Sequence, residues 1–215
     1  MNDGTPSGPP RKRNAAIVAV AAVAAIAGFA AVYGTLGRPD NTGVSSPEAA
    51  APAPETRKRA PGLPAFVFKA APETVADVTF ADAGGGAKTL KDFRGKTILL
   101  NLWATWCAPC REEMPSLDRL QAELGSDKFE VVALAVDRTG PEAAQKFLDS
   151  VSVKALKLYT DTTTRSGSAL KAVGMPVTIL IDPEGREIGR LTGPAEWDSD
   201  AAKALISATL KETGL

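Results

Sequence analysis

The chain contains two cysteines, Cys107 and Cys110, separated by Ala108 and Pro109. The apolar residues 97–103 before them are typical of a strand buried on both faces, and apolar residues at helical spacing follow. A CxxC pair at the start of a helix brings both sulfurs within disulfide reach and points free backbone N–H groups at the first sulfur. We therefore expect Cys107 to be the nucleophilic thiolate and Cys110 to be the resolving thiol that breaks a mixed disulfide.

Other roles for the cysteine pair agree less well with the sequence. A structural disulfide here would close a loop of two residues, which constrains the unfolded chain very little. A structural zinc site needs about four ligands, whereas the chain has no histidine and no third cysteine. A thiol peroxidase does not usually carry a resolving cysteine so close to its nucleophile. We therefore expect a redox-active disulfide, Cys107–Cys110, that works without a metal or another cofactor.

The overall composition narrows the chemistry further. The 25 basic residues match the 25 acidic residues in number, so no net charge attracts nucleic acid. The absence of histidine removes the commonest general base and metal ligand, and with them His-based catalytic triads. With 44% hydrophobic residues the chain can form an ordinary globular core. An enzyme that exchanges thiols and disulfides is the class that remains favoured.

Residues 62–215 are expected to form one α/β domain. Alternating residues at 76–80, a glycine-rich turn at 82–86 and a second short strand at 88–90 predict a hairpin. Strands and helices then alternate along the chain. The predicted strands are 97–103, 129–136, 156–159, 177–181 and 186–191, and the predicted helices cover 114–124, 141–151, 166–173 and 200–210. This order favours a mixed β-sheet flanked by helices.

The N-terminal part of the chain is predicted to anchor this domain in a membrane. Residues 1–14 carry Arg11, Lys12 and Arg13, and residues 15–36 contain no charged side chain. At about 1.5 Å per residue this apolar segment would be roughly 33 Å long, enough to cross a hydrocarbon core of about 30 Å. The positive-inside rule leaves the basic N-terminus in the cytoplasm. We therefore expect a single-pass protein of the inner membrane with its catalytic domain in the periplasm.

Two alternatives remain open for residues 15–36, namely a cleaved signal peptide and a buried core helix. Residues 37–61 are rich in proline and alanine and have no apolar periodicity, so they are predicted to be an extended linker. The basic run at 57–59 could bind lipid, or it could simply keep the linker soluble.

Four segments together resemble the TlpA/ResA-type proteins, which are membrane-anchored thiol–disulfide oxidoreductases of the thioredoxin-like superfamily. These segments are NLWATWCAPCREEMPSLD at 101–118, DFRGKT at 92–97, GMPVTILIDPEG at 174–185 and GPAEW at 193–197. The resemblance covers essentially the whole exported domain. It implies a thioredoxin-like fold with an N-terminal hairpin and a central insertion, preceded by one transmembrane helix.

The resemblance also implies roles for residues around the cysteines. It identifies Pro176 as a cis-proline, rather than an ordinary trans proline, which together with Met175 would bind the extended backbone of a substrate. Trp106 corresponds to an aromatic edge of the substrate groove. Glu113 corresponds to a glutamate near the thiols that could accept the proton of Cys110. Alternatively, Glu113 is a solvent-facing acid that only complements the helix dipole.

One position departs from thioredoxin itself. Thioredoxin has a buried aspartate on the strand, six residues before the first cysteine, and this chain has Asn101 there. Because an amide does not titrate, the resolving thiol needs another proton acceptor. Glu113 is then the favoured candidate.

At the level of function, the resemblance implies a periplasmic reductant of partner-protein disulfides in respiratory cytochrome biogenesis. Its client would be apocytochrome c or a protein that assembles the copper site of cytochrome oxidase. The uncharged pair Ala108–Pro109 between the cysteines favours the reducing direction, and an exported reductant needs a membrane electron donor to re-reduce it. The alternative is a copper metallochaperone on the same fold, although such proteins normally add a histidine to the two thiolates.

Overall fold

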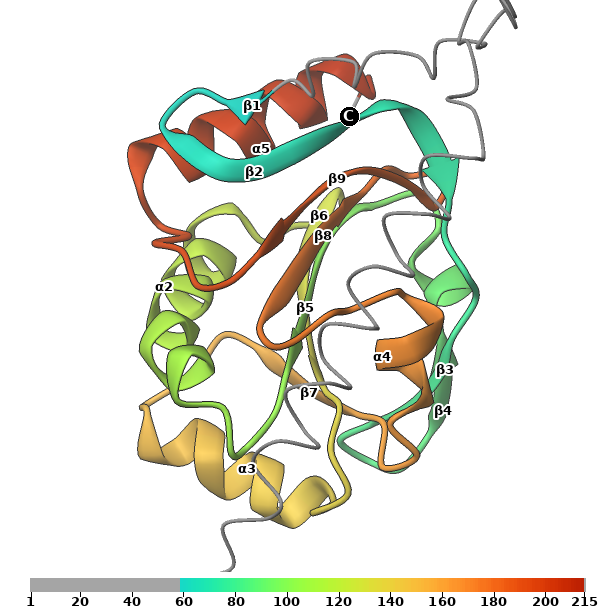
Figure 1. Ribbon diagram of the computed structural model, residues 1–215, viewed down its shortest axis with the longest axis vertical. Coiled ribbons are helices and arrows are strands. Elements are labelled where there is room, and N and C mark those ends of the chain that lie inside the picture. The colour runs from blue at the N-terminus through green and yellow to red at the C-terminus, as the bar shows by residue number, and fades with distance from the viewer. Residues whose placement is uncertain (1–58, 215) are drawn as a thin grey trace, which may run out of the picture. The chain divides into compact units, whose positions relative to one another are not determined.

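The computed structural model describes residues 59–214 of the chain (Figure 1). The predicted N-terminus at 1–14 and the predicted anchor at 15–36 lie outside the described residues. Among residues 59–214, no helix has both the length and the apolar character needed to cross a membrane. Strand β1 (Arg59–Ala60) falls within 37–61, so the sheet begins inside the segment that was expected to be linker.

One mixed β-sheet organises the described domain. Its strands lie in the order β1-β2-β9-β8-β5-β6-β7-β3-β4. After β1 they are β2 (Leu63–Thr74), β3 (Thr79–Asp82), β4 (Ala87–Thr89), β5 (Thr97–Trp103), β6 (Phe129–Ala135), β7 (Lys157–Thr160), β8 (Val177–Ile181) and β9 (Arg186–Thr192). Strands β5, β6 and β7 run parallel, whereas β8 runs antiparallel to both β5 and β9. The predicted mixed α/β sheet is therefore confirmed.

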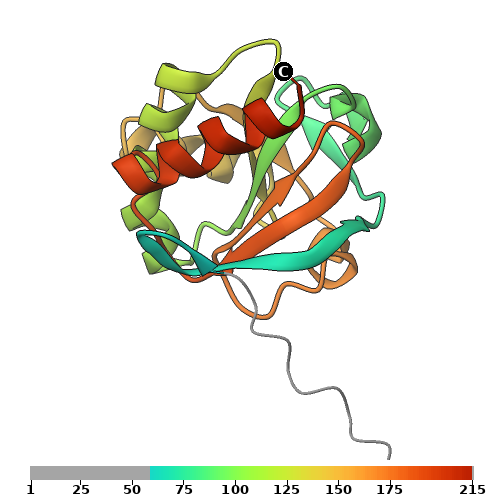
Figure 2. The same cartoon turned by 90° about the horizontal axis from the view of Figure 1, so that it is seen from above.

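Helices cover both faces of this sheet (Figure 1). They are the 3-10 turn η1 (Leu90–Phe93) and the α-helices α2 (Ala108–Leu124), α3 (Pro141–Ser150), α4 (Arg165–Ala169) and α5 (Asp200–Glu212). Helices α2, α3 and α5 contribute to one hydrophobic core, and Figure 2 shows α5 on the same side as α2. Turn η1, strand β3 and the end of α4 contribute to a second core on the other face. Every residue of β5 and β6 is buried between these layers, as expected from their mostly apolar sequences.

Side chains alternate across β5, and this alternation places Asn101 beneath helix α2. Leu99 and Trp103 belong to the core that α2 covers, whereas Leu100 and Leu102 belong to the opposite core. Asn101 has the same parity as Leu99 and Trp103. A fully buried amide therefore lies in the layer between the sheet and α2.

The structure confirms the predicted strands and helices, with small differences at their ends. Helix α4 stops at Ala169, several residues before the predicted end. Strands β3 and β4 form the predicted hairpin, and Asp82 Oδ1 accepts the backbone N–H groups of Gly84 and Gly86 within its turn. The central insertion implied by the resemblance stays a prediction.

Strand β2 is not predicted by the sequence pattern, although it is 12 residues long. It contains two prolines and has no sustained alternation of apolar and polar residues, so local pattern does not reveal it. Pairing with β9 and the complete burial of Phe66 hold it in the sheet. Strand β2 is thus defined by tertiary contacts rather than by local preference.

The loops that carry chemistry meet at one edge of the sheet. Strands β5, β6 and β7 are parallel, so their carboxyl ends lie side by side. Strand β8 runs the other way and begins at the same edge, because Val177 pairs with Leu102. The residues after β5 and β6 and those before β8 therefore converge.

Candidate active site

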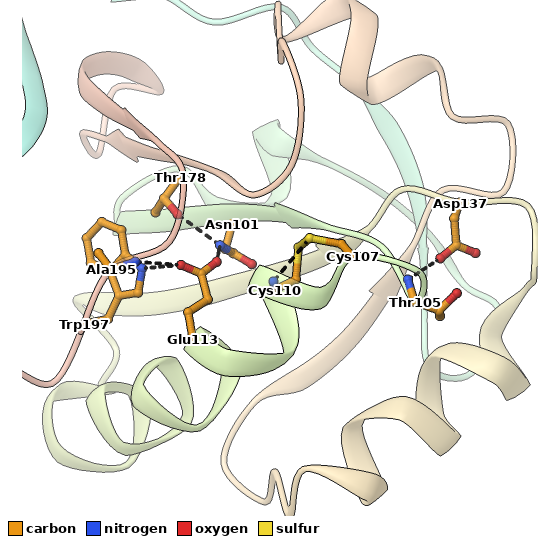
Figure 3. Close-up of a disulfide and its surroundings, with 9 residues drawn as sticks. All are labelled: Asn101, Thr105, Cys107, Cys110, Glu113, Asp137, Thr178, Ala195 and Trp197. Carbon is orange, nitrogen blue, oxygen red and sulfur yellow. Dashed lines mark hydrogen bonds between the residues drawn. A yellow bond between two sulfur atoms is a disulfide. The ribbon is translucent and has the colours of Figure 1, made fainter.

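The two cysteines lie at this edge, at the N-terminus of α2 (Figure 3). They form a disulfide with their Cα atoms 5.3 Å apart. Cys107 is the N-cap residue of α2, and the backbone N–H of Cys110 donates to Cys107 Sγ over 3.2 Å. Pro109 fits in the first turn because a backbone N–H there would have no helical partner. A thiolate at Cys107 would lie at the positive end of the helix dipole and keep this hydrogen bond.

The two sulfur-bearing residues differ in their access to solvent. Cys107 is 4% exposed and Cys110 is completely buried. Ala108 and Pro109 between them are exposed. A partner approaching from solvent would therefore meet Cys107 first, which agrees with the predicted roles of nucleophile and resolving thiol.

The two tryptophans near the cysteines have different environments. Trp106, directly before Cys107, is 70% exposed, so its indole is available to a partner. Trp103 is fully buried and packs against Phe147 with ring centroids 4.7 Å apart. Trp103 is thus part of the core under the site, whereas Trp106 lies on the surface.

Glu113 lies one turn beyond Cys110 on α2 and is only 2% exposed. Its Oε1 accepts a hydrogen bond from Asn101 Nδ2 over 2.8 Å. Its Oε2 accepts from the backbone N–H of Ala195 over 3.1 Å and from Trp197 Nε1 over 3.2 Å (Figure 3). The alternative of a solvent-facing acid is therefore wrong.

The environment of Glu113 suits it to exchange a proton. Burial raises the pKa of Glu113 to about 7, even though its three hydrogen bonds lower it. A carboxyl group that titrates near neutral pH can accept a proton and release it again under the same conditions. Cys110, three residues earlier on α2, lies on the same face of the helix.

Asn101 connects Glu113 to the sheet. Besides its bond to Glu113, Asn101 Nδ2 donates to Thr178 Oγ1 over 2.9 Å. Thr178 lies directly opposite Asn101 in the β5–β8 pairing. From the sequence alone, Asn101 is a residue that does not titrate, and no contact is predicted for it. The available signal was a single amide within an otherwise apolar strand.

The segment before α5 supplies the other partners of Glu113, a role that is not predicted from the sequence. Trp197 is fully buried and its backbone N–H donates to Ser116 Oγ over 3.0 Å. Ser116 Oγ in turn donates to the carbonyl oxygen of Glu113 over 2.7 Å. The motif GPAEW thus supplies two of the three hydrogen-bond donors to the carboxylate.

Asp137, two residues after the end of β6, holds the loop that leads to the cysteines. No role was predicted for it from the sequence. Its Oδ2 accepts the backbone N–H of Thr105 over 2.7 Å, and its Oδ1 accepts the backbone N–H of Thr139 over 2.8 Å. Burial alone would raise the pKa of Asp137, but hydrogen bonds from Thr105 and Thr139 outweigh it and lower the pKa overall. Asp137 is therefore an ionised tether for the residues just before Trp106 (Figure 3).

The loop before β8 contains the predicted proline. The Met175–Pro176 peptide bond is cis, as the resemblance implies. Pro176 is buried, Met175 is half-buried, and the carbonyl oxygen of Pro176 accepts the N–H of Gly193 over 2.9 Å. Val173, three residues before Pro176, is 85% exposed. A role of Met175 and Pro176 in substrate binding stays a prediction.

Within residues 59–214 no group of three or more His, Cys, Asp and Glu side chains is placed to hold a metal ion.

Comparison with known proteins agrees with this arrangement. The profile of the family named Redoxin matches residues 63–205. Thiol-disulfide oxidoreductase ResA of Bacillus thuringiensis subsp. konkukian is 33% identical over 115 residues, which cover 52% of this chain and 64% of that protein. Thiol:disulfide interchange protein HelX of Rhodobacter capsulatus is 35% identical over 123 residues, which cover 57% of this chain and 63% of that protein. The matches thus span slightly less than two thirds of each relative.

A solved structure shows the same fold. The crystal structure of a Chlorobium tepidum protein assigned as thiol:disulfide interchange protein DsbE superimposes with a TM-score of 0.58 at 29% identity. The superposition covers 65% of this chain and 96% of the Chlorobium tepidum chain. The predicted thioredoxin-like fold is therefore confirmed for the described domain. On the family match and this fold, the chain belongs to the redoxin family.

Proposed function

We propose that this protein is a thiol–disulfide oxidoreductase that reduces disulfides in partner proteins. The observation that carries the proposal is the position of Cys107 as N-cap of α2, with the N–H of Cys110 directed at its sulfur. This arrangement stabilises a thiolate on the more accessible cysteine and keeps the second thiol directly behind it. The names of the relatives ResA and HelX support the same activity.

In the proposed reaction the reduced protein attacks first through Cys107. Its thiolate forms a bond to one sulfur of the partner's disulfide, and the partner's other sulfur leaves as a thiolate that takes up a proton. Cys110 then gives its proton to Glu113, and its sulfur attacks Cys107 Sγ. The Cys107–Cys110 disulfide forms, and the partner's second sulfur leaves as a thiolate. The partner has then gained two electrons, and the CxxC pair has lost them.

Substrate binding is assigned to the surface around Cys107. The exposed indole of Trp106 offers a large apolar contact. The loop with Met175 and Pro176 leads into β8 at the same edge of the sheet. An extended segment of a partner protein could pair with the backbone of this loop while its disulfide reaches Cys107.

The proposed direction of electron flow is from this protein to its client. The exposed residues Ala108 and Pro109 place no positive charge between the cysteines, so the stabilisation of a Cys107 thiolate is ascribed to the helix terminus and the N–H of Cys110. The reduced form is then not strongly favoured, which suits a reductant. A membrane protein that passes electrons outward would have to re-reduce the pair.

The proposed setting is respiratory cytochrome biogenesis in the periplasm, with apocytochrome c or a copper-site assembly protein as client. This part rests on the TlpA/ResA-type resemblance and on the uncharged residues 15–36 behind a basic N-terminus. A periplasm-dependent reporter fused after Leu215 should be active and should sediment with membranes. If only a reporter that functions in the cytoplasm is active in this fusion, the catalytic domain is not exported. If the mature protein is soluble, residues 15–36 do not anchor it in the membrane.

The activity itself is tested with the purified, reduced protein. It is mixed in separate reactions with a protein that contains one accessible disulfide and with hydrogen peroxide. We expect fast reduction of the disulfide, slow consumption of peroxide, and no disulfide reduction by the Cys107→Ser variant. Fast peroxide consumption with little disulfide reduction would instead indicate a thiol peroxidase.

A further inference from the structure

Asn101 has a buried oxygen without a partner next to the disulfide. The side chain is completely buried, and in the described part of the chain its Oδ1 makes no hydrogen bond. Figure 3 shows this oxygen directed away from Glu113, toward the side where Cys110 lies. A buried acceptor without a partner is unusual enough to call for an explanation. A disulfide has no proton to donate, but the S–H group of a reduced Cys110 does.

The carboxylate of Glu113 has room for one more hydrogen on the side of Asn101. An ionised carboxylate offers about two acceptor positions on each oxygen. The N–H groups of Ala195 and Trp197 occupy both positions on Oε2, whereas Asn101 occupies one position on Oε1. A proton taken up by Glu113 therefore goes to Oε1, where it meets the amide of Asn101.

We propose that Asn101 is a positioning residue whose amide rotates when the proton of Cys110 passes to Glu113. This inference rests on the proposed function. Before the transfer, Nδ2 donates to the Glu113 carboxylate and Oδ1 accepts the S–H of Cys110. After the transfer, Oδ1 accepts the new O–H of Glu113 and Nδ2 donates to the Cys110 thiolate. In each orientation the amide group donates to the group that is negatively charged and accepts from the group that carries the proton.

Thr178 is suited to both orientations. Its hydroxyl now accepts from Asn101 Nδ2, but a hydroxyl can also donate, so it can bind Oδ1 after the rotation. An aspartate at position 101 would add a second titrating group, whereas an amide changes only its orientation. The step balances because the proton leaves Cys110 Sγ, Glu113 Oε1 binds it, and the electron pair stays on the sulfur that attacks Cys107.

The surroundings make Cys110 and Glu113 the titrating pair. Among residues 59–214, the hydrogen-bond partners of the carboxylate are Asn101 from β5 and Ala195 and Trp197 from the segment before α5, and none of them is charged. The other titratable group on the same face of α2 is Cys110. The rate at which Cys110 resolves a mixed disulfide should therefore follow the titration of this pair.

The rotation can be observed directly in the oxidised protein. With ¹⁵N-labelled asparagine, the Asn101 side-chain N–H protons should show nuclear Overhauser effects to Glu113 at high pH. At low pH, where Glu113 carries the proton, the same protons should show these effects to Cys110. Contacts that stay with Glu113 at both pH values would overturn the proposal. This measurement needs no turnover, so it separates failure of the inference from failure of the proposed function.

A kinetic test uses a small thiol joined to Cys107 as a mixed disulfide, with its release by Cys110 followed from pH 5 to pH 9. Asn101→Leu, of similar size, should slow release roughly tenfold or more below neutral pH, within the range for proton-transfer effects. It should also move the inflection toward the pKa of the thiol. Thr178→Val should slow release less, and Thr178→Ser should restore most of the loss.

The outcomes separate the possibilities. If Asn101→Leu releases the thiol at the wild-type rate with the wild-type pH profile, Asn101 does not assist the transfer. If Asn101→Leu does not fold, the proposal is tested by comparing Thr178→Val with Thr178→Ser. Equal rates of thiol release in these two variants would also overturn the proposal.

Discussion

Trp197 Nε1 donates a hydrogen bond to Glu113 Oε2 over 3.2 Å, between residues that are 84 positions apart in the sequence. The indole is fully buried, and the carboxylate it contacts is buried on the active-site helix. The environment of the acid next to the cysteines is therefore built by two distant parts of the chain. The motif GPAEW contributes to the site through this contact.

Replacing Trp197 by phenylalanine should raise the pKa of Glu113 above about 7. The hydrogen bond from Trp197 stabilises the ionised carboxylate, so its loss favours the protonated form. The pKa can be read from the ¹³C shift of the Glu113 carboxyl carbon in the oxidised protein. Trp103→Phe is the matched control, because Trp103 is also buried under the site but does not bind Glu113. An unchanged or lower pKa in Trp197→Phe would contradict the assignment.

The buried carboxyl of Glu113 should make the stability of the oxidised protein fall as the pH rises. Its pKa is about 7 in the folded state against a reference value of 4.5, so between these values the folded protein holds a proton that the unfolded chain has released. The stabilisation is complete below pH 4.5 and is lost as the pH rises through 7. We expect the free energy of unfolding to fall by about 3 kcal/mol over this window.

Urea unfolding at a series of pH values measures this slope. Glu113→Gln should remove this slope because the amide does not titrate. This expectation holds whatever the stability of the variant is at any single pH. Glu112→Gln, one residue earlier and exposed, should keep the wild-type slope. Equal slopes in the wild type and Glu113→Gln would show that Glu113 has an ordinary pKa.

The same substitution should slow catalysis. Glu113→Gln removes the proposed acceptor for the proton of Cys110, so disulfide reduction should slow roughly ten- to a hundredfold near neutral pH. The loss should shrink as the pH rises past the pKa of the thiol, because hydroxide then removes the proton. Stopped-flow measurement of the reduction rate against pH tests this, with Glu112→Gln as control. If Glu113→Gln has the wild-type rate and pH profile, Glu113 has only a structural role.

Trp106→Ala should separate substrate binding from chemistry. Trp106 is 70% exposed, so its removal should change the free energy of unfolding by less than about 0.5 kcal/mol. The value of kcat/KM for a protein disulfide should fall about tenfold, as expected for an interface contact worth about 1–2 kcal/mol. The reaction with a small aromatic disulfide should be unaffected. Equal losses for both substrates would argue against a binding role.

The sequence predicted most of the fold because local patterns specify it. Strands β5 and β6 are nearly continuous apolar runs, interrupted by Asn101 and Glu130, and α3 begins at Pro141 with apolar residues on one face. Such patterns depend on neighbouring residues only. Strand β2 was missed because pairing with β9 and packing of Phe66 hold it in place, and neither is visible locally.

The candidate site could be predicted only in part for the same reason. Cys107, Cys110 and Glu113 share one helix, and their spacing alone brings them together. Thr178 reaches Asn101 through the register of β8 against β5, and Trp197 reaches Glu113 from the segment before α5. Contacts of this kind depend on how distant elements pack.

The central claim is that Cys107 attacks the partner's disulfide and Cys110 resolves the intermediate. The most direct measurement is intact-mass analysis of the Cys110→Ser and Cys107→Ser variants after each is reduced and mixed with a protein that contains one disulfide. The account predicts that Cys110→Ser accumulates a one-to-one mixed disulfide through Cys107, and that Cys107→Ser forms almost none because Cys110 is completely buried. A mixed disulfide that accumulates on Cys110 instead would contradict it.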